Sequence, residues 1–273
     1  MMSTKLGQLY VETKGQGVPF IWSHGLTHSI EAEKTLGVYD WSSLADSCQL
    51  IRYDALGHGQ SSGSCEAADY RWPRLAQDIM RVADHCIEGH HKIEGFIAGG
   101  ASMGCASSIY AALQQPERIK GLVLVIPPTA WQTRKAQIKM YEKLAATVEA
   151  NGMEHYARQQ RKTPLNPAFL AQLSPNYKMH RAQQLQHMSA DYLPAIYRGA
   201  GGSDLPDTQA LKSIRCPVLV LGWSGDTGHP ASTAQQLIEL IPGAQGVISN
   251  SAEEVRQWPA RAADFIQSIH ASE

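Results

Sequence analysis

The stretch Gly100-Ala101-Ser102-Met103-Gly104 decides the fold of this 273-residue chain. It has the form G-x-S-x-G and lies between an apolar run, residues 93–98, and a helical pattern over residues 105–115. A serine on a sharp strand-to-helix turn needs small residues two positions before and after it, because the backbone folds back tightly there. The following helix points backbone N–H groups and the positive end of its dipole at the serine. The motif therefore predicts a serine held on a strained turn.

Short apolar runs and helical patterns alternate on both sides of this turn. The apolar runs are nearly continuous, as expected of strands in a parallel sheet that helices cover on both faces. Helical spacing separates them, for example at Leu75, Ile79, Val82 and Cys86. The alternation predicts an α/β fold with a doubly wound sheet. The expected strands are residues 17–22, 48–53, 93–98, 122–126, 217–221 and 246–249.

Residues 129–206 break this alternation. They contain no convincing strand pattern, and prolines divide them into short helical stretches. We interpret the segment as a helical cap inserted into one α/β core, which comprises residues 1–128 and 207–273. The cap carries ten Lys and Arg against five Asp and Glu. This balance would attract anionic substrates weakly, but it is more typical of ordinary solvated helix faces.

The composition excludes several classes of protein. Its 24 Lys and Arg against 25 Asp and Glu give a net charge of −1, without the basic excess of nucleic-acid-binding proteins. The longest strongly apolar stretch, residues 122–126, is far shorter than the ~20 residues of a membrane helix. The first ten residues lack a signal-peptide core, and the five scattered cysteines are typical of reduced thiols. We expect a cytoplasmic protein that binds a small molecule, with its oligomeric state left open.

Four segments, in chain order, resemble those of the capped proteins in the α/β-hydrolase-fold superfamily. Ser23-His24-Gly25-Leu26 is similar to the HG loop that forms part of the family's oxyanion hole. Residues 54–61 are similar to its D-x-x-G-x-G-x-S loop, and the serine turn follows. Gly222-Trp-Ser-Gly-Asp226 occupies the place of the acid after a late strand.

This resemblance implies a hydrolase that acts on a carboxylic ester, a lactone or a C–C bond. Ser102 would be the nucleophile and Asp226 the acid that orients a base. The backbone N–H groups of Leu26 and Met103 would form the oxyanion hole. We expect no cofactor and no metal, because the sequence has no cluster of ligands at metal-binding spacing.

One member of the family's catalytic set is missing from its usual place. The family keeps a histidine in the loop after the last strand, a few residues before a proline. Here that loop is residues 250–258, followed by Pro259, and it contains no histidine; Ala252 lies near the expected position. A serine hydroxyl needs an adjacent base, and loss of the histidine from such a triad lowers kcat by about 10⁶. The chain therefore resembles a branch that lacks this C-terminal histidine.

His229 is the foremost candidate for the base. It lies three residues after Asp226 and directly before Pro230, in a pattern Gly-Asp-x-x-His-Pro that resembles another branch of the superfamily. His28 is the second candidate, because its loop also borders the expected pocket.

Further groups remain open as the base, and others are assigned to structure. Glu253 or Glu254 could serve if burial raised the pKa of its carboxyl, and His155, His180 or His187 could reach down from the cap. We expect His58 to be a structural hydrogen-bonder of its loop and His270 to lie on the wrong side of the sheet. His85, His90 and His91 are expected on the surface.

Two kinds of function fit this sequence. The first is an enzyme that uses Ser102, Asp226 and an atypical base, with His229 in that role. The second is a catalytically silent or ligand-binding member of the fold, and lyase or oxygenase-like chemistry in the same pocket is a third reading. Fold alone does not separate them, because this fold hosts both hydrolases and non-hydrolases. An imidazole within hydrogen-bond reach of the Ser102 hydroxyl would favour the enzyme.

Overall fold

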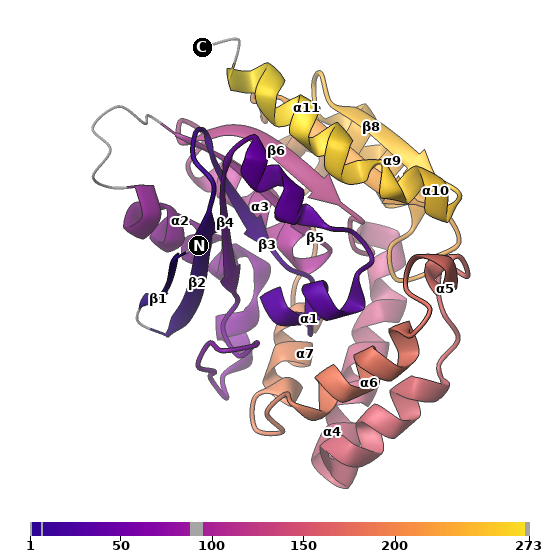
Figure 1. The fold of residues 1–273 in the computed structure, drawn as a ribbon. Coiled ribbons are helices and arrows are strands. Elements are labelled where there is room, and N and C mark those ends of the chain that lie inside the picture. Colours follow the sequence, from indigo (N-terminus) through magenta and orange to yellow (C-terminus); the bar gives the residue numbers. More distant parts are fainter. Residues whose placement is uncertain (1, 7, 88–94, 271–273) are drawn as a thin grey trace.

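The computed structural model of the chain describes residues 2–6, 8–87 and 95–270. Within them, eight strands form one sheet in the order β1-β2-β4-β3-β5-β6-β7-β8 (Figure 1). The strands from β4 to β8 in this order are parallel, and β1 and β2 pair antiparallel at one edge. The strands are β1 (Met2–Leu6), β2 (Leu9–Lys14), β3 (Pro19–Ser23), β4 (Gln49–Asp54), β5 (Phe96–Ala101), β6 (Ile119–Val125), β7 (Val218–Trp223) and β8 (Gln245–Ser249).

The expected α/β architecture is confirmed, with shifts of at most three residues at the strand ends. The start of the strand expected over 93–98 falls partly outside the described residues. The antiparallel pair β1 and β2 was not expected from the sequence. In β2, buried Leu9 and Val11 alternate with partly exposed Tyr10. This is the pattern of a half-buried strand, which a search for continuous apolar runs misses.

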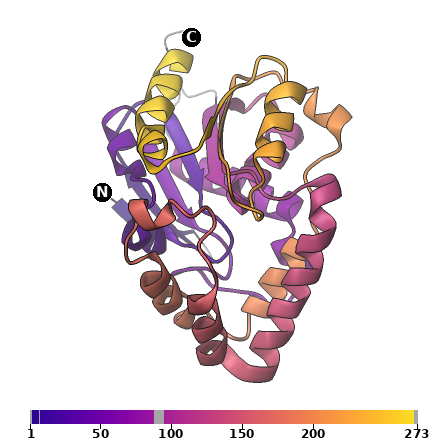
Figure 2. The same ribbon diagram turned by 90° about the vertical axis from the view of Figure 1, so that its right-hand side faces the viewer.

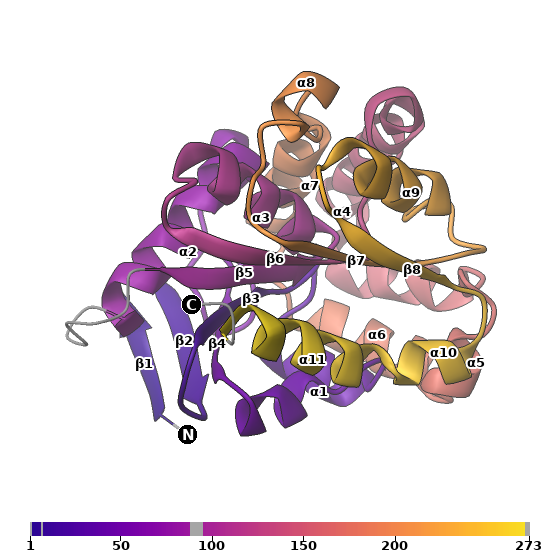
Figure 3. The same ribbon diagram turned by 90° about the horizontal axis from the view of Figure 1, so that it is seen from above.

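Helices cover both faces of the sheet. In Figure 3, α2, α3 and α9 lie on one face, and α1 and α11 lie on the other. Side chains alternate along β3, so that Ile21 packs into one core and Phe20 and Trp22 pack into the second. The helices of these layers are α1 (Ile30–Leu36), α2 (Trp72–Ile87), α3 (Met103–Gln114), α8 (Thr208–Leu211), α9 (Ala231–Leu240), α10 (Ala252–Arg256) and α11 (Trp258–His270), with 3₁₀ helices η1 (Trp41–Asp46) and η2 (Ala67–Tyr70).

Between β6 and β7, residues 129–206 fold into helices without a strand and gather at one end of the sheet (Figures 1 and 2). We call this segment the cap; its standing as a separate domain stays a prediction. No helix in the described part of the chain is both long and apolar enough to cross a membrane. The helices of the cap are η3 (Trp131–Thr133), α4 (Arg134–Lys162, with a kink at Gly152), α5 (Leu170–Leu173), α6 (Tyr177–Gln186) and α7 (Leu193–Gly201).

The buried Arg134 joins the two ends of the cap. Its guanidinium donates hydrogen bonds to the carbonyl oxygens of Ser203 (2.8 Å) and Ala200, and to Thr129 Oγ1 (3.1 Å). The same group lies 4.3 Å from the centroid of the Trp72 ring on α2. The charge is thus satisfied by carbonyl dipoles and an aromatic face. These contacts fix where the cap leaves and rejoins the core.

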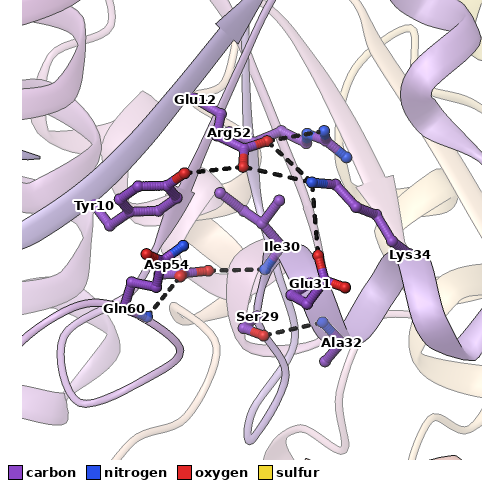
Figure 4. A network of polar contacts seen from close by, with 10 residues as sticks. All are labelled: Tyr10, Glu12, Ser29, Ile30, Glu31, Ala32, Lys34, Arg52, Asp54 and Gln60. Atoms are coloured by element: carbon purple, nitrogen blue, oxygen red, sulfur yellow. Dashed lines mark hydrogen bonds and ion pairs between the residues drawn. The ribbon is translucent and has the colours of Figure 1, made fainter. Parts of the chain in front are cut away.

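A polar network fastens the start of α1 to the sheet (Figure 4). Asp54, at the end of β4, accepts hydrogen bonds from the backbone N–H groups of Ile30 (2.8 Å) and Gln60 (2.8 Å). Ser29 caps the helix through its side-chain oxygen. The loop of residues 24–28, which enters α1, is therefore held at both the helix and the strand.

A buried carboxylate extends this network along β2. Glu12 pairs with Arg52 on β4 and with Lys34 on α1, both at 3.3 Å, and accepts a hydrogen bond from the Tyr10 hydroxyl at 3.1 Å. Removing one partner of a buried ion pair leaves an uncompensated charge, which is strongly destabilising. These ion pairs therefore connect the antiparallel strand β2 to β4 and to α1.

Candidate active site

Ser102 lies on a strained turn between β5 and α3. Its backbone has φ 53° and ψ −106°, a conformation that residues other than glycine rarely adopt. The glycines two positions away are required by close packing. A Cβ atom at Gly100 would lie 2.4 Å from the carbonyl oxygen of Ser23, and one at Gly104 would lie 2.0 Å from the same oxygen. This is the physical reason for the G-x-S-x-G spacing.

His229 lies beside this serine. Its Nε2 atom is 2.8 Å from Ser102 Oγ, and its Nδ1 atom is 2.7 Å from Asp226 Oδ2. A carboxylate at Nδ1 stabilises the tautomer that has its proton there, which leaves Nε2 free to accept from the serine hydroxyl. The three side chains thus form one hydrogen-bonded chain from carboxylate to imidazole to hydroxyl.

Asp226 is fixed by four donors. One oxygen accepts from the His229 ring and from the Trp223 indole (3.1 Å), and the other accepts from the backbone N–H groups of Gly228 (2.8 Å) and His229 (3.3 Å). Burial alone would raise the pKa of the Asp226 carboxyl. The interactions with His229, Gly228 and Trp223 outweigh burial and hold that pKa below its ordinary value. The carboxylate is therefore kept ionised.

The acid and the imidazole belong to a single turn after β7. The Asp226 side chain hydrogen-bonds its own backbone two and three residues further on, which folds the turn and brings His229 back over the carboxylate. Trp223 supports the turn from below: its indole contacts Asp226, and its ring packs against Trp258 at a centroid distance of 5.7 Å.

Two candidate N–H donors flank the serine. Met103 is the first residue of α3, where a backbone N–H has no intrahelical acceptor. Leu26 follows Gly25, and a Cβ atom at Gly25 would lie 3.7 Å from Ser102 Cβ. The HG loop therefore passes directly beside the serine, and Leu26 lines the same cavity as Ser102.

Two neutral histidines hold this loop. The ring of His24 accepts a hydrogen bond from the Ala55 N–H at 2.9 Å, and the ring of His58 accepts one from the Thr27 N–H at 3.1 Å. Burial lowers the pKa of His24 to about 4 and that of His58 to about 3. Both rings therefore stay uncharged near neutral pH and act as fixed acceptors, as expected for His58.

Comparison with known proteins identifies the family. Residues 20–259 match the family described as the alpha/beta hydrolase family. The chain belongs to the alpha/beta hydrolase family. The match includes the serine turn, the turn that carries Asp226 and His229, and the cap.

One relative and two solved structures illustrate what this member of the alpha/beta hydrolase family is similar to. A protein of Klebsiella pneumoniae (strain 342) named "Putative carbamate hydrolase RutD" is 29% identical over 213 residues, covering 73% of this chain and 71% of that protein. A thermophilic esterase from Thermogutta terrifontis, solved with malate bound, has a TM-score of 0.76 at 21% identity, with 97% of this chain and 93% of that chain covered. The enol-lactonase from Burkholderia xenovorans LB400 has a TM-score of 0.75 at 18% identity, with 96% of each chain covered.

A cavity of about 250 Å³ lies between the core of this hydrolase and its cap. Ser102, His229 and Asp226 line it from the core, together with Leu26 and the buried Glu33. The cap contributes several tyrosines and one arginine: Tyr141, Tyr156, Tyr177, Tyr197 and Arg181. The cavity has room for a small organic molecule in contact with the serine hydroxyl.

Glu33 is an acid within this cavity that the sequence did not single out. One carboxyl oxygen accepts a hydrogen bond from the Trp22 indole at 2.8 Å, and the other is buried without a partner among the described residues. Burial raises the pKa of Glu33 to about 7, against the opposing effect of the Trp22 hydrogen bond. In the sequence, Glu33 looks like an ordinary surface glutamate in the first turn of a helix. No sequence pattern would therefore have placed it in the cavity.

The other candidates for the base do not meet Ser102. His28 lines the cavity but forms no hydrogen bond with the serine. Glu253 and Glu254 are exposed, and Glu254 accepts from the backbone N–H of Asn250 at 2.7 Å, so neither faces the serine. Ala252 is buried at the start of α10, which occupies the segment where the family usually keeps its histidine.

The remaining histidines lie elsewhere. His155 and His187 are exposed on the cap, His180 lines a neighbouring groove, and His85 is exposed on α2. His90 and His91 are outside the described residues, and His270 ends α11. Over residues 2–6, 8–87 and 95–270, no three His, Cys, Asp or Glu side chains gather as a metal site would require.

Proposed function

We propose that this protein is a cytoplasmic enzyme that hydrolyses a carboxylic ester, a lactone or a C–C bond of a small molecule. Ser102 is the nucleophile, His229 is the general base and acid, and Asp226 orients the imidazole. The N–H groups of Leu26 and Met103 form the oxyanion hole. The substrate binds beneath the cap.

The observation that carries the proposal is the continuous hydrogen-bonded chain from Asp226 through His229 to Ser102, at 2.7 and 2.8 Å. These distances are those at which a base takes a proton directly from a nucleophile. A catalytically silent descendant would have no need to keep three side chains in this order at the floor of a cavity. The arrangement therefore favours the enzyme over the ligand-binding alternative.

The reaction with an ester follows from this geometry. Ser102 Oγ attacks the carbonyl carbon while its proton passes to His229 Nε2, and the carbonyl oxygen becomes an oxyanion held by the two peptide N–H groups. The carbon–oxygen bond then breaks, and the imidazolium returns the proton to the departing alkoxide. Water, activated by the same imidazole, attacks the acyl-serine, and the acid leaves as Ser102 regains its proton.

Asp226 stabilises the positive charge that develops on His229 during both transfers. Because its carboxylate is buried and fixed by Trp223 and Gly228, it needs little rearrangement when that charge appears. The carboxylate that stabilises the imidazolium is therefore already in position before the reaction begins.

A panel of p-nitrophenyl esters of increasing acyl length tests the function, with Ser102→Ala as the control. We expect hydrolysis of the shorter esters by the wild-type protein, because the cavity is small, and loss of the activity in the variant. Turnover that is the same in both proteins would contradict Ser102 as the nucleophile, and no turnover of any ester would contradict the ester as substrate.

A further inference from the structure

Arg181 is the arginine that the cap places in the catalytic cavity. It lies on α6 and reaches across to the HG loop, where its Nη1 donates to the carbonyl oxygen of Thr27 at 2.6 Å. It also bonds the hydroxyl of Thr27 and the side-chain oxygen of Gln184. These contacts hold the guanidinium in one place at the cavity wall, next to the turn that carries Leu26.

No carboxylate neutralises Arg181 within the described residues. The ion pairs there account for other arginines of the cap: Arg198 pairs with Glu142 (2.9 Å) and Glu149 (2.5 Å), and Arg158 pairs with Glu154 (2.7 Å). Those pairs are largely exposed. Arg181 differs because it is half-buried at the active site and bound only to neutral oxygens, which leaves its positive charge uncompensated.

The acids of the cavity are already engaged elsewhere. Asp226 is bonded to His229 and Trp223. Glu33 is bonded to Trp22, and the charges that act on it are those of Arg52 and Asp54 rather than Arg181. A carboxylate that enters the cavity would therefore not compete with an internal carboxylate for the arginine.

Two further polar side chains border the same part of the cavity. His28 and Tyr177 both line it. Within the described residues, the ring nitrogens of His28 and the hydroxyl of Tyr177 form no hydrogen bond. Burial, followed by the charge of Arg181, lowers the pKa of His28 well below its ordinary value, so the imidazole stays neutral. A neutral imidazole and a phenol add hydrogen-bond capacity without a competing charge.

We propose that Arg181 binds a carboxylate of the substrate, so that the enzyme prefers esters whose acyl chain ends in an acid. The proposal rests on the proposed function and names its substrate class. A guanidinium presents N–H groups in a planar fork that matches a carboxylate. The hydrogen bonds between the two charged groups are stronger where bulk water is excluded. With Ser102 and Arg181 lining one cavity of about 250 Å³, the acyl chain is short.

A matched pair of substrates isolates the charge. p-Nitrophenyl hydrogen glutarate carries a free carboxylate at pH 7.5, and its methyl ester has the same acyl chain without the charge. We expect the wild-type protein to favour the acid by about tenfold or more in kcat/KM, the effect of one hydrogen-bonded charge pair. A wild-type ratio near one overturns the proposal.

Variants at the arginine locate the preference. In Arg181→Gln we expect the ratio to fall to near one, mainly through a higher KM for the acid, and in Arg181→Lys we expect part of it to remain. Arg158→Gln, which removes an exposed cap arginine, is the matched control and should leave the ratio unchanged. If Arg181→Gln lowers kcat for both esters equally, with the preference intact, the arginine only holds the Thr27 loop and the proposal is wrong.

A binding measurement separates this proposal from the proposed function. Glutarate should bind Ser102→Ala protein, followed by calorimetry, and should bind at least about tenfold more weakly when Arg181→Gln is added. Equal binding by both proteins contradicts the carboxylate site, whatever the esterase result. If glutarate binding depends on Arg181 but the wild-type protein hydrolyses no ester, the carboxylate site is upheld and only the proposed function is overturned.

Discussion

Ser102 Oγ and His229 Nε2 lie 2.8 Å apart, although 127 residues separate them along the chain. Ser102 follows β5 and His229 follows β7, two strands away in the sheet. Because the strands are parallel, their carboxyl ends meet at one edge, and the turns that follow them can bring side chains together. The turn that supplies the histidine also supplies its carboxylate, so the acid and the proposed base are positioned as one unit.

We predict that Ser102 reacts with a fluorophosphonate probe. The strained turn presents its hydroxyl to the cavity and to His229, and both conditions favour attack on the phosphorus. Mass spectrometry of the labelled protein should place the adduct on the peptide that contains Ser102. Labelling should vanish in Ser102→Ala, whereas a Ser107→Ala control, at a buried serine of α3, should label normally. An adduct elsewhere in the wild-type protein would remove Ser102 from the mechanism.

We predict that Asp226→Asn lowers kcat by about 10²- to 10⁴-fold with little change in KM. An amide at this position no longer stabilises the imidazolium, and its NH₂ group can favour the tautomer that has Nε2 protonated. Steady-state kinetics on the best p-nitrophenyl ester measures the effect. Asp191→Asn, at an exposed acid of the cap, is the control. An Asp226→Asn enzyme with a kcat close to that of the wild type contradicts the orienting role.

Gly104→Ala is expected to destabilise the fold by about 3 kcal/mol or more, because its Cβ would lie 2.0 Å from the Ser23 carbonyl oxygen and the rigid strand cannot yield. Urea denaturation followed by circular dichroism measures this loss. Gly201→Ala is the matched control: its Cβ would meet only Tyr141 Cβ at 3.8 Å, in a helix, and we expect no loss of stability. Equal unfolding midpoints for the two variants would show that the turn tolerates a side chain.

The buried Glu33 predicts a pH dependence of stability. Its pKa is raised from 4.5 to about 7 on folding, so its contribution is fully present below pH 4.5 and is lost as the pH rises through 7. Glu33→Gln keeps an acceptor for the Trp22 indole without this titration. The free energy of unfolding of Glu33→Gln, relative to that of the wild type, should rise by about 2 kcal/mol between pH 5.5 and pH 8.5. Urea denaturation at both pH values measures this difference, with Glu31→Gln at an exposed acid as the control. A difference in unfolding free energy between Glu33→Gln and wild type that does not change with pH would contradict the prediction.

The sequence predicted the parallel sheet and the serine turn because both depend on local patterns. Near-continuous apolar runs specify buried strands, and the glycines of the G-x-S-x-G motif are required by the backbone of Ser23. The antiparallel strands β1 and β2 were not predicted. In β2, buried Leu9 and Val11 alternate with partly exposed Tyr10, a pattern that a search for continuous apolar runs misses.

The site was harder to predict because its geometry depends on tertiary structure. His229 could be selected through its spacing from Asp226, but only the fold shows that the turn after β7 faces the turn after β5. Arg181 and Glu33 had no signal at all. Each enters the cavity through the packing of its helix, which a local sequence pattern does not encode.

The kcat of His229→Ala on a p-nitrophenyl ester measures whether His229 is the base for Ser102. His155→Ala, at an exposed cap histidine, is the control. Because a serine without its base loses most of its reactivity, we expect kcat to fall by about 10³-fold or more while the control keeps wild-type activity. A His229→Ala enzyme that retains more than a tenth of the wild-type kcat would show that His229 is not the base.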